Sequence, residues 1–96
     1  MYLIEKSEDF LLERNDILSY VYRKTCSINI TTDLFNKIES KILLLKITPE
    51  MFRKRESWFR IIPLNSYSIL YKVFLDEKIV RIYSIVYSSS NYQEYI

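Results

Sequence analysis

The sequence contains no glycine and no histidine, and its single cysteine is Cys26. Without glycine, neither a phosphate-binding P-loop nor a dinucleotide-binding fingerprint can form, because both require glycines at fixed positions. A zinc site of the usual His and Cys kind and catalytic Ser-His or Cys-His pairs are excluded for lack of histidine. A lone cysteine cannot form an internal disulfide, which agrees with a reducing compartment. We therefore expect no metal and no cofactor, and any catalysis must rely on arginine, lysine, tyrosine, serine or carboxylates.

Long apolar runs and a basic-then-apolar leader pattern are also missing, so we expect a cytoplasmic protein without a membrane span. A length of 96 residues predicts one domain, residues 1–96. The net charge of +2 is too small to indicate nucleic-acid binding by itself. The only local concentration of charge is Arg53-Lys54-Arg55, with Arg60 shortly after it. Such a run is usually a solvated loop, and a phosphate-binding role is the alternative.

The stretch from Trp58 to Tyr87 is dominated by β-branched and aromatic residues. Polar clusters interrupt it at residues 65–66 and again at residues 76–78. This pattern predicts three consecutive strands joined by short turns, an antiparallel meander.

A short strand and a first helix are predicted before the meander. Residues 2–6 favour a strand. Ser7 is a suitable N-cap, and two acidic residues follow it in the first turn, where the helix dipole favours them. Apolar residues then recur at helical spacing as far as Lys24.

A second helix is predicted to begin at Thr31 as its N-cap. Its apolar residues follow steps of four, four and three, which place them on one helix face. Pro49 disfavours helical geometry at the preceding residue, so this helix should end at about Lys46 or Ile47. The fold class is therefore α+β, with an N-terminal strand, an antiparallel helical hairpin and a three-stranded meander covered by the helices.

The alternation along the last two strands predicts which face the helices cover. If Lys72 and Arg81 mark the outer face, the opposite residues form the core with the second helix. The predicted core contains Ile38, Ile42, Leu45, Ile69, Tyr71, Val73, Val80, Ile82 and Val86. The outer face would then carry Leu70, Phe74, Tyr83, Ile85 and Tyr87. An outer face this apolar indicates a surface that a partner chain covers, and the alternative is that the N-terminal strand or the tail covers part of it.

Several segments, in this order and spacing, resemble the RelE/ParE superfamily of toxins from type II toxin–antitoxin modules. Residues 16–21 read Asp-Ile-Leu-Ser-Tyr-Val, similar to the family's Asp-Ile-x-x-Tyr-Ile. Residues 38–45 precede a proline, similar to its Ile-x-x-Leu-x-x-x-Pro. Phe59-Arg60 followed by residues 67–73, Tyr-Ser-Ile-Leu-Tyr-Lys-Val, is similar to its Tyr-Arg…Tyr-x-Ile-x-Tyr-x-Val. Residues 85–87 stand where relatives read Ile-Leu-His or Ile-Leu-Tyr.

The chain departs from the family pattern after Tyr87. Many ParE-like relatives continue Gly-Arg-Arg-Asp-Tyr, whereas this chain continues Ser-Ser-Ser-Asn-Tyr over residues 88–92. Ser68 also replaces a basic residue that the superfamily's ribosome-dependent nucleases carry in the middle strand. The resemblance therefore favours the ParE-like branch. RNA cleavage would also need a proton acceptor near neutral pH, and the sequence has no obvious one unless a lysine or tyrosine has a strongly lowered pKa.

Two sets of site residues follow from this resemblance and from the charge pattern. The residues expected to contact a target or a phosphate are Arg53, Lys54, Arg55, Arg60, Arg81, Tyr87, Asn91, Tyr92 and Tyr95, although Arg81 also fits a salt-bridged surface position. The residues expected to contact an antitoxin are Leu70, Phe74, Tyr83 and Ile85.

The resemblance implies a growth-inhibiting toxin that is neutralised by a cognate antitoxin, with DNA gyrase as the target of ParE-like relatives. The alternatives are a ribosome-dependent mRNA endonuclease of the RelE branch and an inactive member that acts only as a binding module. The assembly is open between a homodimer and a toxin–antitoxin hetero-oligomer.

Overall fold

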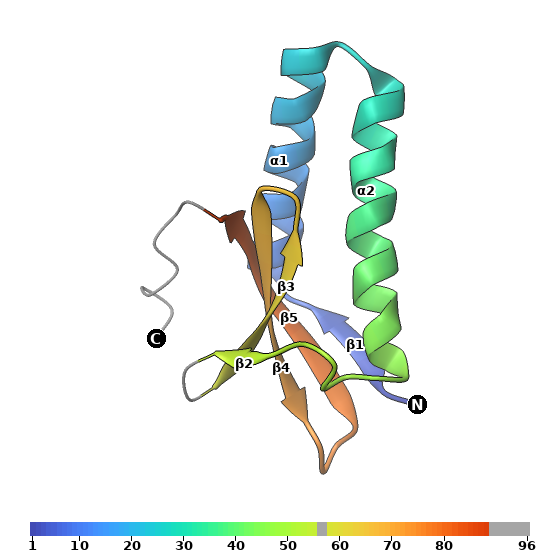
Figure 1. Ribbon diagram of the computed structural model, residues 1–96, viewed down its shortest axis with the longest axis vertical. Coiled ribbons are helices and arrows are strands. Elements are labelled where there is room, and N and C mark those ends of the chain that lie inside the picture. The colour runs from blue at the N-terminus through green and yellow to red at the C-terminus, as the bar shows by residue number, and fades with distance from the viewer. Residues whose placement is uncertain (56–57, 89–96) are drawn as a thin grey trace.

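The computed structural model describes residues 1–55 and 58–88, with the exception of the side chain of Arg55. A five-stranded sheet is covered on one face by a helical hairpin, and the hairpin extends beyond the sheet along the long axis (Figure 1). The strand order is β1-β5-β4-β3-β2, with β1 parallel to β5 and the other pairs antiparallel. Within the described residues, neither helix is long and apolar enough to cross a membrane.

The helical hairpin consists of α1 (Glu8–Thr25) and α2 (Ile28–Leu43). The predicted cap of α1 is confirmed, because the Ser7 hydroxyl accepts a hydrogen bond from the Phe10 amide at 3.0 Å. Cys26 ends α1 in the left-handed conformation with φ 52°, and its amide donates to the Tyr22 carbonyl at 2.7 Å. The predicted start of α2 at Thr31 is wrong, since Ser27 caps the helix directly after this tight reversal.

The meander prediction is confirmed by β3 (Phe59–Leu64), β4 (Tyr67–Phe74) and β5 (Ile79–Tyr87). The N-terminal strand β1 (Leu3–Lys6) pairs with β5 along its whole length. A further strand that the sequence did not indicate, β2 (Lys54–Arg55), pairs with β3 at the opposite edge. A short 3₁₀ helix η1 (Leu44–Lys46) follows α2, so the helical segment ends where Pro49 predicted.

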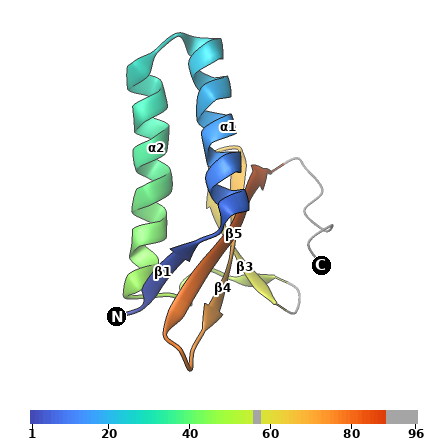
Figure 2. The same cartoon turned by 180° about the vertical axis from the view of Figure 1, so that it is seen from behind.

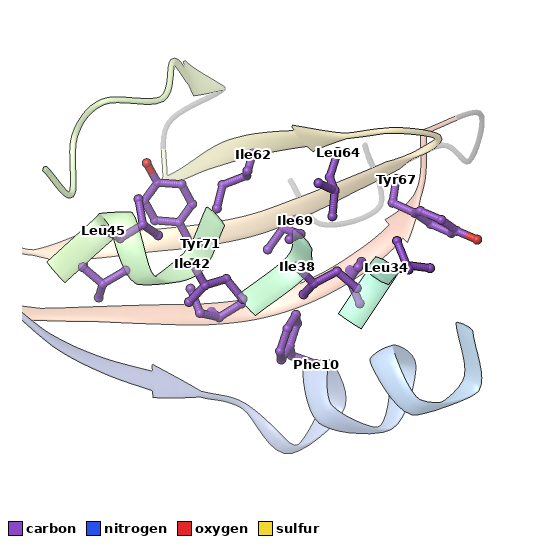
Figure 3. Packing of buried hydrophobic residues seen from close by; sticks show 13 residues of the cluster. Phe10, Leu34, Ile38, Ile42, Leu45, Ile62, Leu64, Tyr67, Ile69 and Tyr71 are labelled. Atoms are coloured by element: carbon purple, nitrogen blue, oxygen red, sulfur yellow. The ribbon is translucent and has the colours of Figure 1, made fainter. Parts of the chain in front are cut away.

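The core lies between the sheet and the hairpin, and Figure 3 shows the side chains of α2 pointing onto β3 and β4. The predicted core residues Ile38, Leu45, Ile69, Tyr71 and Ile82 are 0% exposed, and Ile42 is 2% exposed. Phe10 of α1 joins them. At roughly 1.5–3 kcal/mol for each large side chain buried, this cluster is the main source of stability.

An irregularity in β5 reverses the predicted faces of its second half. Leu70 pairs with Ser84, but Tyr71 pairs with Ile82, so Tyr83 is an extra residue opposite the partner strand. Such a bulge shifts the alternation of side chains by one position. Ile85 therefore belongs to the core cluster on the helix face, and its predicted place on the outer face is wrong. For the same reason, the predictions that Val86 faces the helices and that Tyr87 lies on the outer face are wrong, since Val86 pairs with Ser68 and Tyr87 pairs with the core residue Tyr67.

The bulge is held by the first turns of α1. The Ser7 hydroxyl donates to the Tyr83 carbonyl at 2.7 Å. One carboxylate oxygen of Glu13 accepts from the Ser84 hydroxyl at 2.7 Å and from the Ile85 amide at 3.2 Å. Glu13 thus gives the Ile85 amide a hydrogen-bond partner at a point of β5 that β1 does not reach. The same contacts hold α1 against the sheet.

Candidate functional surfaces

Arg60 lies on β3, where its guanidinium holds the segment that leads into β2. One terminal nitrogen donates to the Phe52 carbonyl at 2.9 Å, and the other lies 3.0 Å from a carboxylate oxygen of Glu50. Tyr71 fixes the same segment, because its hydroxyl donates to the Pro49 carbonyl at 2.9 Å. Arg60 is thus engaged within the chain, and its predicted contact with a phosphate or a partner stays a prediction.

The basic run lies on and beside β2, at one edge of the sheet. Arg53 and Lys54 are exposed, and among the described side chains neither forms a salt bridge. The side chain of Arg55 is outside the described part of the structure. Among the described side chains of the predicted target-binding cations, Arg53 and Lys54 are therefore the ones that are exposed and form no salt bridge.

Arg81 on β5 forms a salt bridge with Glu5 of the neighbouring strand β1, as the salt-bridged alternative predicted. Its Nε and one terminal nitrogen lie 3.0 and 2.9 Å from the same carboxylate oxygen of Glu5. The guanidinium also lies 4.9 Å from the centre of the Phe74 ring. The hydrogen bond to Glu5, followed by one to Tyr83, raises the pKa of Arg81 above its usual value. The side chain therefore remains a paired cation on the outer face.

Neither Tyr71 nor Tyr67 provides a base near neutral pH. Burial raises the pKa of Tyr71 to about 12, although Arg60 and the nearby Phe52 backbone oppose this shift. Burial, together with Tyr87 and Tyr20, also raises the pKa of Tyr67. A general base needs the opposite shift, towards the pH at which it works.

The outer face of the sheet is partly covered by the chain itself. Phe59 and Leu70 are fully buried there, and the Trp58 ring lies 4.7 Å from Phe59 and 5.2 Å from Tyr83, measured between ring centres. Of the four predicted antitoxin contacts, Leu70 is thus buried on the outer face and Ile85 is buried on the helix face. Phe74 and Tyr83 are partly exposed, and their predicted contact with an antitoxin stays a prediction.

The end of β5 brings tyrosines of β4 and β5 together. Tyr87 is 49% exposed, and its ring centre lies 5.1 Å from that of Tyr67. Ser88 follows, with its hydroxyl 3.3 Å from that of Ser68. The predicted contacts at Asn91, Tyr92 and Tyr95 lie outside the described residues.

A groove that the sequence did not indicate runs between β1 and α2. It encloses about 510 Å³ and has both apolar and charged walls. It is lined by Leu3, Ile4, Lys6, Asn36, Glu39, Ser40, Ile42, Leu43 and Lys46. Figure 2 shows β1 running from the C-terminal end of α2 to the start of α1.

A polar clamp closes the inner end of this groove. The carboxylate of Glu39 on α2 pairs with Lys6 of β1 and, at 3.1 Å, with Arg14 of α1. The Arg14 guanidinium also lies 5.2 Å from the centre of the Phe35 ring. One carboxylate thus connects three elements. Within the part of the chain that the structure describes, no group of three His, Cys, Asp or Glu side chains could hold a metal ion.

Comparisons with known proteins identify the fold and the family. Residues 4–92 match the family model of the ParE toxin of the type II toxin–antitoxin system parDE. A chain of the chromosomal ParDE system from P. aeruginosa is 13% identical, with a TM-score of 0.74 over 91% of this chain and 96% of that one. In the intact E. coli RelBE toxin–antitoxin complex, the similar chain is 16% identical, with a TM-score of 0.64 over 94% and 100%. In the archaeal RelE–RelB complex from Pyrococcus horikoshii, the values are 12% and 0.61 over 94% and 98%. No curated protein matches the sequence significantly.

Proposed function

Since the chain belongs to the ParE toxin family of type II toxin–antitoxin systems, we propose that it inhibits growth by poisoning DNA gyrase and that a cognate antitoxin neutralises it in the cytoplasm. The solved relatives are toxin–antitoxin complexes, which supports an antitoxin as the partner. The choice of gyrase over the ribosome rests on the arrangement of charged and titratable groups.

The observation that carries this choice is that Arg60 and Arg81, two of the cations at the sheet, are engaged within the chain. Cleavage of RNA by attack of the 2′-hydroxyl builds up negative charge on the phosphorus centre, which positive groups must surround. Arg60 is bound to Glu50 and to the Phe52 carbonyl, and Arg81 is bound to Glu5. Ser68 is only 7% exposed and stands where nucleases of the RelE branch carry a basic residue.

Two further observations support the same choice. Arg60 and Arg81 lie on opposite faces of the sheet, because Arg60 pairs with Tyr71 of the core whereas Arg81 stands between the core residues Val80 and Ile82 on β5. The outer face also holds the buried apolar side chains of Phe59 and Leu70. The raised pKa of Tyr71 and of Tyr67 leaves both hydroxyls protonated at neutral pH. A charge-assisted phosphate contact contributes about 1.5–3 kcal/mol, so the loss of several would remove most of the stabilisation of the transition state.

Two alternatives stay open from the same residues. Arg53 and Lys54 are exposed cations, and they leave room for a ribosome-dependent endonuclease of the RelE branch. An inactive member that only binds its antitoxin is the second alternative, since the arginines expected after Tyr87 are replaced by Ser-Ser-Ser-Asn over residues 88–91.

Induced expression separates the three functions. We expect expression of this chain to arrest growth. Co-expression of the candidate antitoxin, the protein encoded by the neighbouring reading frame, should relieve the arrest. Ribosome-bound mRNA should stay intact, and purified protein should inhibit supercoiling by gyrase. Cuts in mRNA that depend on Arg53 and Lys54 would support the nuclease instead. Binding of the neighbouring protein without growth arrest would support the inactive module.

A further inference from the structure

β1 is an edge strand whose outward backbone groups are placed by its pairing with β5. The amides of Leu3 and Ser7 donate to the carbonyls of Lys78 and Ile82, each at 2.9 Å. Because strand residues alternate in direction, the amides and carbonyls of Ile4 and Lys6 face away from β5. The outward amide of Tyr2 is already taken by the Lys46 carbonyl at 2.8 Å. The open edge is therefore short, and η1 closes one end of it.

The groove beside this edge offers apolar contacts in line with the open backbone. Ile42, at 2% exposure, belongs to the floor, whereas Leu3 and Leu43 are 62% and 58% exposed on the rim. Asn36 and Ser40 add polar groups from α2. An extended segment beside β1 would place alternate side chains in the groove, which is how strand addition combines backbone affinity with side-chain specificity.

The charges at the groove define the side chain that such a segment must carry. Lys6 and Lys46 line the groove together with one carboxylate, that of Glu39. Glu39 is shared between Lys6 and Arg14, so the positive charges outnumber the negative charge there. A second copy of this chain would bring a groove of the same positive charge, which opposes self-pairing. A carboxylate from a different chain would complement it.

We infer that the open edge of β1 and the groove beside α2 receive an extended segment of the antitoxin that alternates apolar side chains with a carboxylate. This inference rests on the proposed function, which supplies the antitoxin. The antitoxin would then contact β1 and α2 in place of Leu70 and Ile85, which are buried.

The test compares variants at the two edges of the sheet in binding to the purified protein from the neighbouring reading frame. Ile4→Pro removes an amide that faces away from β5, and proline is tolerated at such positions of edge strands. Ile4→Ala is its matched control, because both variants lose the side chain that lines the groove and packs against the core. Loss of one backbone hydrogen bond should weaken binding by about tenfold. Lys46→Glu leaves the backbone intact and reverses a charge in the groove, and it should weaken binding at least about fivefold. Lys54→Glu makes the same charge change at β2, and binding should stay within about twofold of wild type.

The outcomes separate this inference from the proposed function. Wild-type affinity in Lys46→Glu and in a folded Ile4→Pro would overturn the docking site while leaving the toxin assignment intact. Weakening by Lys54→Glu alone would place the partner at β2. If the isolated chain is dimeric in sedimentation and Ile4→Pro makes it monomeric, the occupant is a second copy and the inference is wrong. If the wild type neither binds the neighbouring protein nor arrests growth, the proposed function itself fails.

Discussion

The two edge strands of the sheet differ in length, charge and surroundings. β2 spans only Lys54–Arg55, and the exposed cations Arg53 and Lys54 lie on or beside it. β1 is four residues long and borders a groove with an apolar floor. Short, charged edges resist pairing with another chain, whereas a longer edge beside apolar surface invites it. β2 is therefore a protected edge, whereas β1 has the features of an edge that pairs with another chain, as we propose for the antitoxin.

The largest expected effect concerns the floor of the β1 groove. Ile42→Ala should lower the free energy of unfolding by roughly 2–5 kcal/mol, because it opens a cavity where the groove meets the core. Leu43→Ala is the matched control on the rim, since Leu43 is 58% exposed. It should change stability by less than about 0.5 kcal/mol and still weaken antitoxin binding. Urea denaturation of both variants measures the difference, and a similar loss for each would show that the rim is part of the core.

Tyr71 holds the segment before β2 through its buried hydroxyl. This group should make the free energy of unfolding fall with rising pH in the alkaline range. Tyrosine titrates near 10 in an unfolded chain, whereas burial raises the pKa of Tyr71 to about 12 in the folded protein. The unfolded state then releases its proton first, so the contribution is complete below pH 10 and is lost as pH rises from 10 to 12. A difference of about two pKa units corresponds to a loss of up to about 3 kcal/mol. Denaturation at a series of pH values tests this, and Tyr71→Phe should lose less stability over the same range.

The clamp that fastens β1 to both helices should contribute less than the core. Glu39→Gln would weaken the pairing with Lys6 and Arg14, which are partly buried, and should cost about 1–2 kcal/mol. Glu5→Gln is the matched change at the exposed pair with Arg81 and should cost less than about 1 kcal/mol. Thermal unfolding of the two variants compares them directly. Equal losses would mean that Glu39 is no more than a surface ion pair.

The smallest effect on stability is expected at β2. Replacement of Arg53 and Lys54 by alanine should change the free energy of unfolding by less than about 0.5 kcal/mol, because both side chains are exposed. If these charges protect the edge, the double variant should self-associate at concentrations where the wild type is monomeric. Sedimentation at increasing concentration measures this. A monomeric double variant would show that the short length of β2 is sufficient protection.

Much of the fold follows from the sequence because the signals are local. The cap at Ser7, the alternation along β4 and the end of α2 before Pro49 all depend on neighbouring residues. The bulge at Tyr83 does not, because both possible alternations of β5 after that point contain large apolar residues. Its position depends on Glu13 and Ser7, about seventy residues earlier. The two-residue strand β2 is too short to show an alternation at all.

The candidate site was less predictable for a related physical reason. The sequence identifies Arg60 and Arg81 as cations, but their roles depend on partners that the fold supplies. Glu50 lies ten residues before Arg60, and Glu5 lies on the parallel strand β1. The parallel pairing of β1 with β5 also creates the groove beside α2. No pattern within β1 or α2 alone indicates this pairing.

Amide hydrogen exchange of the free chain and of its complex with the neighbouring protein tests the contrast between the two edges most directly. We expect the amides of Ile4 and Lys6 to exchange rapidly in the free chain and to slow markedly in the complex, while those of residues 53–55 do not change. Slowed exchange at residues 53–55 with unchanged Ile4 and Lys6 would contradict it.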